Sequence, residues 1–467
     1  MRIGLIYPNE GKKEKAIHLG LGYIASYART QHSDLHFTIL DTRIASKREK
    51  QKFLDSQFDL IGITLMSGIF KQALDIAKKI RKHNPSAIIC VGGPYVSSLE
   101  KEILNFSEFD LAVFGEGEIT FSEIISAIKN EKDLAEIDGL IYRSRDGIIT
   151  MNKARGIKNT IDSIPIPAYD LFKMNKYPNY RILSSRGCPY KCSFCSSADV
   201  WQYRWQKRNP QFIIEEIKFL IDNYGRKTFF FNDDTFNMSL KRAEEFCDLL
   251  IENDLNILWT TPFRADRVDS NLANKMKKAG CYNVAIGIES ADNAILELME
   301  KQMTIEQITE GIKILRKAGI EVLGQFVIGV PGETPQSFEK TLLYAKNSEL
   351  DFILFYSSLP YKKTSQWDFV ENNGKFLHKT MHEYHDIKPR VVFETNEFQY
   401  KDRVEAIKKA EKAGFYVDDN RLSHVFDFGR TAAKYFQHYL PAKMGNAIYL
   451  KMKKIYRENL KGKLINN

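Results

Sequence analysis

Three cysteines within eight residues are the side chains of this sequence with the clearest capacity for chemistry. Cys188, Cys192 and Cys195 have the spacing C-x3-C-x2-C, and residues 181–185 just before them are expected to form a short strand. A loop this short can bring three thiolates to one face of a metal centre without help from elsewhere. Soft sulfur ligands suit zinc or an iron–sulfur cluster.

The number of ligands favours the cluster over zinc. Structural zinc has a closed set of four ligands, typically as two pairs. No fourth Cys or His lies near these three in the sequence, and the next cysteines downstream are Cys247 and Cys281. Three cysteines on a four-iron cluster would leave one iron open for a substrate or cofactor. Structural zinc stays as the alternative.

The composition of the chain is typical of a soluble globular protein. Its 467 residues are enough for two or three domains, with 43% hydrophobic and 27% charged residues. The start of the chain is strand-like and not a signal peptide, and no apolar run approaches the ~18 residues of a membrane span. Six cysteines without a secretion signal indicate a reducing cytoplasm. Cys90, Cys247 and Cys281 are expected to be small core residues.

The positive charge is concentrated at the end of the chain. Residues 401–467 contain 15 Lys or Arg and 7 Asp or Glu, so they account for +8 of the net charge of +9. A uniformly basic nucleic-acid binder would not have this distribution. Apolar and basic residues after residue 430 predict an amphipathic helix. Such a helix either contacts an anionic membrane surface or an acidic partner, or it docks on the protein itself.

Residues 1 to about 130 alternate strand and helix signals. Five apolar runs rich in β-branched residues predict an α/β fold with a Rossmann-like, doubly wound parallel sheet covered on both faces. Such sheets bind ligands beyond the carboxyl ends of their strands. No G-x-G-x-x-G follows the first strand, which disfavours a dinucleotide. Small or polar residues stand at the strand ends: Thr64, Ser67, Gly92, Gly93, Gly115 and Gly117.

A second set of alternating strands and longer helices begins at Arg181. Six such units predict a partial (β/α)6 barrel, in which chemistry takes place at the carboxyl ends of the strands. The cysteine loop follows the first of these strands. The ends of the later strands have small or polar residues, namely Asp233, Asp234, Arg264, Glu289, Ser290 and Gly329.

The chain is therefore expected to have four consecutive parts. Residues 1–135 would form the amino-terminal sheet domain, and residues 136–175 a hairpin around Asp146-Gly147 followed by a proline-rich linker. Residues 176–375 would form the barrel. Residues 376–467 would form a basic, mostly helical region.

The cysteine spacing, with Phe194 just before the last cysteine, resembles the radical S-adenosylmethionine (SAM) superfamily. The strand ends of residues 175–350 are similar in order and spacing to the subfamily whose members also have a cobalamin domain. Residues 1–130, including Gly20-Leu21-Gly22-Tyr23, resemble that cobalamin-binding domain more loosely.

The resemblance implies a role for each candidate residue. Cys188, Cys192 and Cys195 would hold a [4Fe–4S] cluster whose open iron binds SAM. SAM would contact the backbone around Phe194, the carboxylate of Asp233 or Asp234, and the residues Arg264, Glu289, Ser290 and Gly329. Cobalamin would lie against Thr64, Ser67, Gly92, Gly93, Gly115 and Gly117. A turn or helix-capping role is the alternative for Asp233 and Asp234.

Two segments depart from the family pattern. Members that ligate cobalt through histidine have D-x-H-x-x-G, whereas the segment after the second expected strand is Asp41-Thr42-Arg43-Ile44-Ala45-Ser46. Cobalt would lack a histidine ligand from this position, and some members keep the domain without the cofactor. The segment Pro360-Tyr361-Lys362-Lys363-Thr364 has Lys363 where the family often has a glycine. This departure blurs any inference about the substrate.

The resemblance implies an enzyme that reductively cleaves SAM to a 5′-deoxyadenosyl radical, with an electron from a flavodoxin or ferredoxin. The expected reaction is cobalamin-dependent methylation of an unactivated carbon in a small-molecule or lipid-linked substrate. The alternative within enzymes is a cobalamin-independent dehydratase, epimerase or cyclase. The alternative outside enzymes is a zinc-containing nucleic-acid-binding protein. No acid–base catalytic residue is required by this chemistry, and none is obvious.

Overall fold

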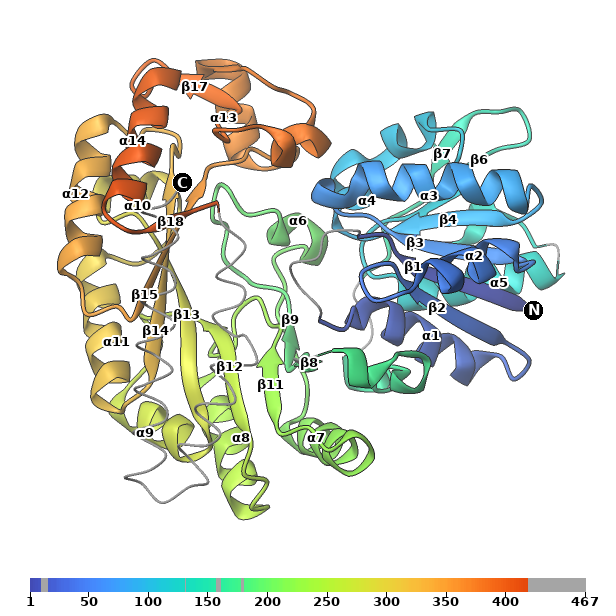
Figure 1. Ribbon diagram of the computed structural model, residues 1–467, viewed down its shortest axis with the longest axis horizontal. Helices are drawn as coiled ribbons and strands as arrows, with labels where there is room; N and C mark the ends of the chain where they lie inside the picture. The colour runs from blue at the N-terminus through green and yellow to red at the C-terminus, as the bar shows by residue number, and fades with distance from the viewer. Residues whose placement is uncertain (10–15, 131, 157–160, 178–179, 419–467) are drawn as a thin grey trace. The chain divides into compact units, whose positions relative to one another are not determined.

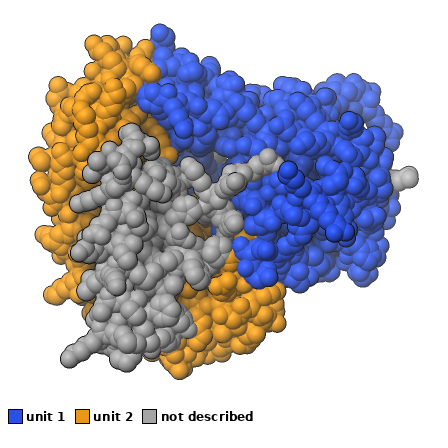
Figure 2. Space-filling model, viewed as in Figure 1, with its two compact units in different colours: residues 1–176, 186–208, 359–393 blue, residues 177–185, 209–358, 394–467 orange. Residues whose placement is uncertain are grey.

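The computed structural model describes residues 1–9, 16–130, 132–156, 161–177 and 180–418. Two compact units divide the chain (Figures 1 and 2). Unit 1 contains residues 1–176, 186–208 and 359–393, and unit 2 contains residues 177–185, 209–358 and the described residues from 394 onward. The units are interleaved along the chain, whereas the four-part division expected from the sequence is consecutive. That division stays a prediction.

Unit 1 contains a seven-stranded sheet in the order β2-β1-β3-β4-β5-β6-β7. The five parallel strands expected from the sequence are present, and β6 and β7 add the expected antiparallel hairpin. Because the strand order reverses between β1 and β3, the crevice of a doubly wound sheet lies beyond these two strands. The strands are β1 (Arg2–Tyr7), β2 (His36–Asp41), β3 (Leu60–Thr64), β4 (Ile88–Gly92), β5 (Leu111–Val113), β6 (Leu140–Arg143) and β7 (Ile149–Met151).

The helices of unit 1 cover this sheet, with α1 packed beside α5 and α2 beside α3 (Figure 1). Ser46 and Glu49 form a capping box that starts α2. Trp367 and Tyr384 share one hydrophobic core with Ile63 and Val91, so residues 359–393 complete the core of this unit. The helices are α1 (Leu19–Gln31), α2 (Lys47–Asp55), α3 (Phe70–His83), α4 (Pro94–Leu99), α5 (Glu118–Asn130), α6 (Ser197–Trp201) and α13 (Ser365–Asn373).

Unit 2 contains a parallel seven-stranded sheet in the order β18-β15-β14-β13-β12-β11-β8. Six of these strands are those expected from the sequence, and β18 is an addition that was not expected. Its strands are β8 (Tyr180–Ile182), β11 (Thr228–Phe231), β12 (Leu258–Phe263), β13 (Cys281–Glu289), β14 (Glu321–Ile328), β15 (Phe352–Ser357) and β18 (Tyr416–Val417). The remaining strands of the described residues are short: β9 (Ser185–Arg186), β10 (Gln206–Lys207), β16 (Gly374–Phe376) and β17 (Phe393–Thr395).

Helices follow the strands of unit 2 as the alternating pattern predicts. An aromatic core of Phe231, Phe246 and Trp259, packed edge to face, supports the sheet. Thr334 caps α12 and Pro335 is its first residue, as expected. The helices are α7 (Pro210–Tyr224), α8 (Leu240–Glu252), α9 (Ser270–Lys278), α10 (Asn293–Leu298), α11 (Ile305–Lys317), α12 (Pro335–Asn347) and α14 (Tyr400–Lys412).

In the described ranges, no helix has the length and apolar character required to cross a bilayer. The amphipathic helix expected after residue 430 lies outside the described residues.

Candidate functional site

Cys188, Cys192 and Cys195 lie in unit 1, between β9 and α6. All three are half-buried thiols, and a backbone hydrogen bond from Cys195 N to Cys192 O (3.0 Å) closes the turn between the last two. Thiols on an accessible loop are a donor set that fits an iron–sulfur cluster. In the described part of the chain, no group of three or more His, Cys, Asp or Glu side chains is arranged to hold a metal ion as it stands. The assignment of these three ligands stays a prediction.

The other three cysteines are buried, as the sequence predicts. Burial raises the pKa of the Cys90 and Cys247 thiols, so these groups keep their protons. A buried, protonated thiol is a poor metal ligand. Cys90, Cys247 and Cys281 therefore serve as core residues.

Gly187 makes the turn that leads into the cysteine segment. Its φ is +79°, and a Cβ atom at this position would lie 2.1 Å from the carbonyl oxygen of Arg204. Only glycine satisfies both conditions, because L-residues are strained at positive φ and a real Cβ cannot approach a backbone oxygen so closely.

Asp233 holds the residues that come immediately before this turn. Its carboxylate accepts hydrogen bonds from Ser184 N (2.8 Å) and Ser185 Oγ (2.7 Å), and a third from Ser184 Oγ. The guanidinium of Arg242 donates to the carbonyl oxygen of Ser184. Burial raises the pKa of Asp233, and the Ser184 hydrogen bond and the charge of Arg242 oppose this shift. Asp233 is engaged within unit 2, whereas the neighbouring Asp234 is exposed.

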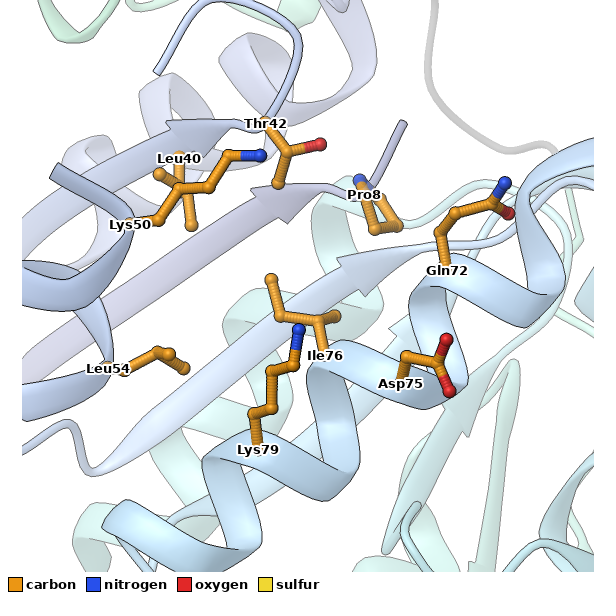
Figure 3. A pocket seen from close by; sticks show the side chains of 9 residues that line it. All are labelled: Pro8, Leu40, Thr42, Lys50, Leu54, Gln72, Asp75, Ile76 and Lys79. Carbon is orange, nitrogen blue, oxygen red and sulfur yellow. The ribbon is translucent and has the colours of Figure 1, made fainter. Parts of the chain in front are cut away.

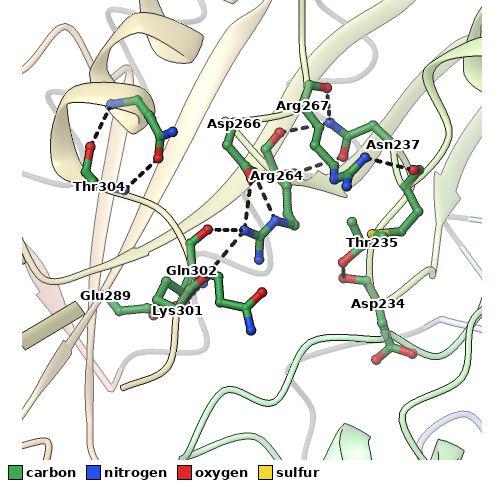
Figure 4. A network of polar contacts seen from close by, with 12 residues as sticks. Asp234, Thr235, Asn237, Arg264, Asp266, Arg267, Glu289, Lys301, Gln302 and Thr304 are labelled. Carbon is green, nitrogen blue, oxygen red and sulfur yellow. Dashed lines mark hydrogen bonds and ion pairs between the residues drawn. The ribbon is translucent and has the colours of Figure 1, made fainter. Parts of the chain in front are cut away.

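Arg264, at the carboxyl end of β12, is almost completely buried and belongs to the network of polar contacts drawn in Figure 4. Its guanidinium forms two hydrogen bonds to Asp266 (2.9 and 3.1 Å) and also donates to the carbonyl oxygens of Lys301 and Gln302. Its backbone N–H donates to Asn237 Oδ1 (2.9 Å). Arg264 therefore ties together three segments at this end of the sheet.

Glu289 has an unusual backbone at the end of β13. Its φ is +67°, and the register of β13 against β14 shifts between Gly287 and Glu289. The Glu289 carboxylate accepts a hydrogen bond from the Lys301 ammonium (2.8 Å), and both side chains are about 10% exposed. A non-glycine residue at positive φ costs roughly 1–3 kcal/mol and is concentrated at functional sites. The role of Glu289 in SAM binding stays a prediction.

Ser290 and Gly329 stand at the same end of the sheet. Ser290 is fully buried, with its Oγ 3.2 Å from Thr341 Oγ1. Gly329 has a φ of +87°; its N–H donates to Glu333, and its carbonyl oxygen accepts from Arg403 of α14 (2.6 Å). Burial raises the pKa of Glu333 to about 7. Sequence reasoning missed Glu333 and Arg403 as supports of the Gly329 turn.

The glycines at the strand ends of unit 1 fall into two groups. Gly93 and Gly115 have positive φ, and this backbone conformation alone explains why glycine stands at these positions. Gly92 and Gly117 do not have positive φ, and a Cβ at either would make only ordinary contacts at 3.7 and 3.6 Å. The protein's own packing does not require glycine at these two positions. A large ligand that lies close to the backbone would require it, so this edge fits cobalamin.

Two described side chains near the β1–β3 reversal, Arg43 and His18, are not available as nitrogen ligands for cobalt. Arg43, in the position of the family histidine, forms an ion pair with Asp41, donates to the carbonyl oxygen of Ala16 (2.6 Å), and lies over the Tyr7 ring. Burial lowers the pKa of His18 to about 4, so its ring is neutral. Because Nδ1 of His18 accepts from Leu21 N, the proton of this ring is on Nε2.

A small pocket of about 100 Å³ lies between α2 and α3, outside the predicted sites (Figure 3). The ammonium groups of Lys50 and Lys79 and the carboxylate of Asp75 give it a mixed-charge lining. None of the residues expected to contact cobalamin lines it. The pocket does not change the assignment of the site.

Two family models match the chain. The radical SAM superfamily model matches residues 182–345, and the B12 binding domain model matches residues 13–125. An uncharacterised methyltransferase of Pyrococcus horikoshii is 34% identical over 386 residues, which cover 79% of this chain and 82% of that protein. The chain belongs to the radical SAM superfamily. It also contains a B12-binding domain.

Further comparisons agree with this membership. An anaerobic magnesium-protoporphyrin IX monomethyl ester cyclase of Rubrivivax gelatinosus is 28% identical over 395 residues, with 78% of this chain and 70% of that protein covered. The solved structure of the radical SAM methyltransferase TsrM from Kitasatospora setae has a TM-score of 0.74 at 16% identity and covers 97% of this chain and 99% of that chain. The structural likeness shows that the two proteins share a fold.

Membership makes this radical SAM protein an enzyme with a [4Fe–4S] cluster, SAM and, through its B12-binding domain, cobalamin as cofactors. A small-molecule substrate and an electron donor are consistent with the superfamily. The structure brings Arg264, Glu289, Ser290 and Gly329 to one end of the unit 2 sheet. Lys301 was not predicted from the sequence. The one indication of it is that a buried acid such as Glu289 at a strand end needs a nearby cation.

Proposed function

We propose that this protein transfers a methyl group from SAM, through cobalamin, to a carbon of a small molecule. The observation that supports the proposal is the presence of both cofactor domains in one chain, together with 34% identity to a methyltransferase along both domains. When bound, the cluster and SAM supply a radical that can take hydrogen from an unactivated carbon, and cobalamin supplies a methyl group.

The residues of this chain bind and orient these groups. Cys188, Cys192 and Cys195 would hold the cluster, and the backbone at Phe194 would lie along the adenine of SAM. Arg264, Glu289, Ser290 and Gly329 would line the SAM site, and Asp233 or Asp234 would accept from the SAM ammonium. Asp233 is already engaged by Ser184 and Ser185. Thr64, Ser67, Gly92, Gly93, Gly115 and Gly117 would line the cobalamin edge.

Two steps of the test need no knowledge of the substrate. The protein is reconstituted without oxygen, and iron, sulfide and cobalamin are measured; about four irons per chain are expected. It is then reduced with SAM whose methyl group is deuterated. Deuterated methylcobalamin and S-adenosylhomocysteine are expected products. If 5′-deoxyadenosine forms without S-adenosylhomocysteine, methyl transfer is excluded.

A cysteine control is available within the chain. Cys188→Ala is expected to lose most of the iron, because two thiolates cannot retain the cluster. Cys90→Ala makes the same change at a buried cysteine that is not a proposed ligand, and this variant is expected to keep the iron. Equal iron in both variants would contradict the ligand assignment.

The second candidate is a radical SAM cyclase that does not use cobalamin for methyl transfer. The 28% identity to a cyclase of Rubrivivax gelatinosus favours it over other rearrangements. The product test separates the two candidates, because this cyclase reaction would form no S-adenosylhomocysteine.

We also propose a flavodoxin or ferredoxin as the electron donor and the cytoplasm as the location, since all six cysteines are free thiols, which suits a reducing compartment. A lipid-linked substrate and membrane contact through residues 430–467 also stay proposals. These residues lie outside the described ranges. Flotation with liposomes, with and without residues 430–467, tests membrane contact; identical behaviour would exclude it.

A further inference from the structure

Arg186 is a buried cation held between two carboxylates. Its side chain is 5% exposed, with Nη1 3.1 Å from Glu116 Oε1 and Nη2 2.6 Å from Glu118 Oε1. Its guanidinium also lies over the rings of Tyr23 (5.0 Å) and Trp201 (5.8 Å). All of these residues belong to unit 1.

Arg186 and its two glutamate partners come from segments that are assigned to different cofactors. Arg186 precedes Gly187 and Cys188, at the start of the segment with the three cysteines. Glu116 and Glu118 stand on either side of Gly117, just after β5, at the edge assigned to cobalamin. The Gln206 side-chain amide, from the far end of the cysteine segment, also donates to Glu116 (3.4 Å). The cysteine segment is therefore fastened at both of its ends to the loop after β5.

The geometry of this bridge depends on arginine. A guanidinium presents several N–H donors in a planar fork and can bind two carboxylates at once, whereas an ammonium is a compact point charge. Removal of the cation would leave two nearby acids without their partner, one of them almost fully buried. The carboxylates would then repel each other, and the loop after β5 would keep its contact with Gln206 but lose its bridge to the start of the cysteine segment.

We propose that Arg186 is a positioning residue that couples the binding of cobalamin to the binding of the iron–sulfur cluster. A ligand that orders the loop after β5 also orders the cysteine segment through this bridge, and the reverse follows because coupling between two sites is reciprocal. The inference depends on the proposed function, in that it uses the assigned cluster ligands and cobalamin edge.

The test measures the dissociation constant of hydroxocobalamin for the full chain, with and without a reconstituted cluster. For the natural chain we expect cobalamin to bind about tenfold more tightly when the cluster is present, a typical magnitude for coupled sites. For Arg186→Gln we expect this ratio to fall to about one, with the iron content of the reconstituted protein still measurable. Arg186→Lys, which keeps the charge and loses the fork, is expected to restore part of the ratio.

Lys191→Gln is the matched control. Lys191 is an exposed cation in the same segment, adjacent to Cys192, and it lies over the Tyr203 ring rather than on the two glutamates. Its removal changes the charge near the cysteines and leaves the bridge intact, so we expect the ratio of the natural chain. If Arg186→Gln does not fold, Glu116→Gln, which weakens one of the two contacts, reports on the same ratio.

The outcomes separate this inference from the proposed function. Cobalamin binding whose ratio is the same in the natural chain, Arg186→Gln and Glu116→Gln would overturn the inference and leave the proposed function standing. A natural chain that holds four irons and binds no hydroxocobalamin would overturn the cobalamin part of the proposed function and the inference with it. A reduced ratio in Lys191→Gln equal to that in Arg186→Gln would assign the effect to charge alone and overturn the role of the bridge.

Discussion

The ammonium of Lys301 lies 2.8 Å from the carboxylate of Glu289, and both groups are about 10% exposed. The side chain of Glu289 folds back over Gly287, where a Cβ would lie 2.3 Å from its Oε1. Gly287, Glu289 and Lys301 therefore form one unit that fixes a carboxylate at the end of β13, at the cost of a positive φ at Glu289.

Replacement of Lys301 by Met should destabilise the protein by about 3 kcal/mol, because it leaves a buried carboxylate without its cation. It should also weaken SAM binding, since Glu289 would no longer be held in place. Denaturant unfolding and equilibrium dialysis with SAM measure the two effects. Lys340→Met removes a cation that is 66% exposed from its pair with Asp292 and should cost less than about 1 kcal/mol. Equal costs in the two variants would contradict this account.

Asp233→Asn should reduce the amount of iron that the protein retains after reconstitution. The amide cannot accept all three hydrogen bonds from Ser184 and Ser185, so the start of the cysteine segment becomes less ordered. A loss of about 2 kcal/mol in the free energy of unfolding should accompany it. Asp234→Asn changes the neighbouring exposed acid and should leave both quantities unchanged. Iron analysis and urea unfolding decide between these outcomes.

Gly187→Ala and Gly147→Ala separate backbone strain from steric conflict. Both glycines have nearly the same φ, +79° and +78°. A Cβ at Gly147 has nothing within 4 Å, so alanine there should cost about 1–2 kcal/mol from strain alone. At Gly187 the Arg204 carbonyl adds a clash, so the cost should be clearly larger and iron binding should be lost. Similar unfolding free energies for the two variants would show that the turn at Gly187 can adjust.

Two buried groups should produce opposite pH dependences of stability. Glu333 has a pKa raised to about 7, so between its unfolded value of 4.5 and pH 7 the native state binds the extra proton and stability falls as the pH rises. His18 has a pKa lowered to about 4, so between pH 4 and its unfolded value of 6.5 the unfolded state binds the extra proton and stability rises with pH. Each effect amounts to about 3 kcal/mol over its full range.

The two contributions are separated by substitution. Relative to the natural chain, Glu333→Gln should gain stability as the pH rises from 5 to 7.5, and His18→Gln should lose stability over the range from 4 to 6.5. Urea unfolding at half-unit steps of pH provides the differences. If the difference in unfolding free energy between a variant and the natural chain does not change with pH, the corresponding group has its ordinary pKa in the folded protein.

Cobalamin bound to this protein should have no nitrogen ligand from Arg43 or His18. Arg43 is engaged by Asp41, and His18 has its proton on Nε2. The electron paramagnetic resonance spectrum of bound cob(II)alamin should therefore be unchanged in His18→Gln. A nitrogen hyperfine splitting that is lost in His18→Gln would identify His18 as a ligand.

The sequence predicted the elements that depend on local pattern. The strands of both sheets follow from β-branched runs, and the start of α12 follows from Thr334 and Pro335. Contacts between distant segments could not be predicted in this way. Arg403 supports Gly329 from 74 residues downstream, and Arg186 finds its partners about 70 residues upstream. No local periodicity encodes such pairs, because the fold alone brings them together.

The same limit applies to the roles of the acids. Asp233 and Asp234 are equivalent in sequence, yet one is buried under Ser184 and Ser185 and the other faces solvent. The alternation of side chains at a strand end decides which of two neighbours points inward. The phase of that alternation depends on where β11 ends, which a single sequence places only within a few residues.

The contact between Arg403 and the carbonyl oxygen of Gly329 has a practical consequence for shortened versions of the protein. A fragment that ends at residue 358 would retain every strand from β8 to β15 and still lose the brace behind the Gly329 turn. Any attempt to isolate the SAM-binding half for crystallisation or ligand screening should therefore extend through α14. In a fragment cut earlier, the Gly329 turn would lack the Arg403 contact that it has in the intact chain.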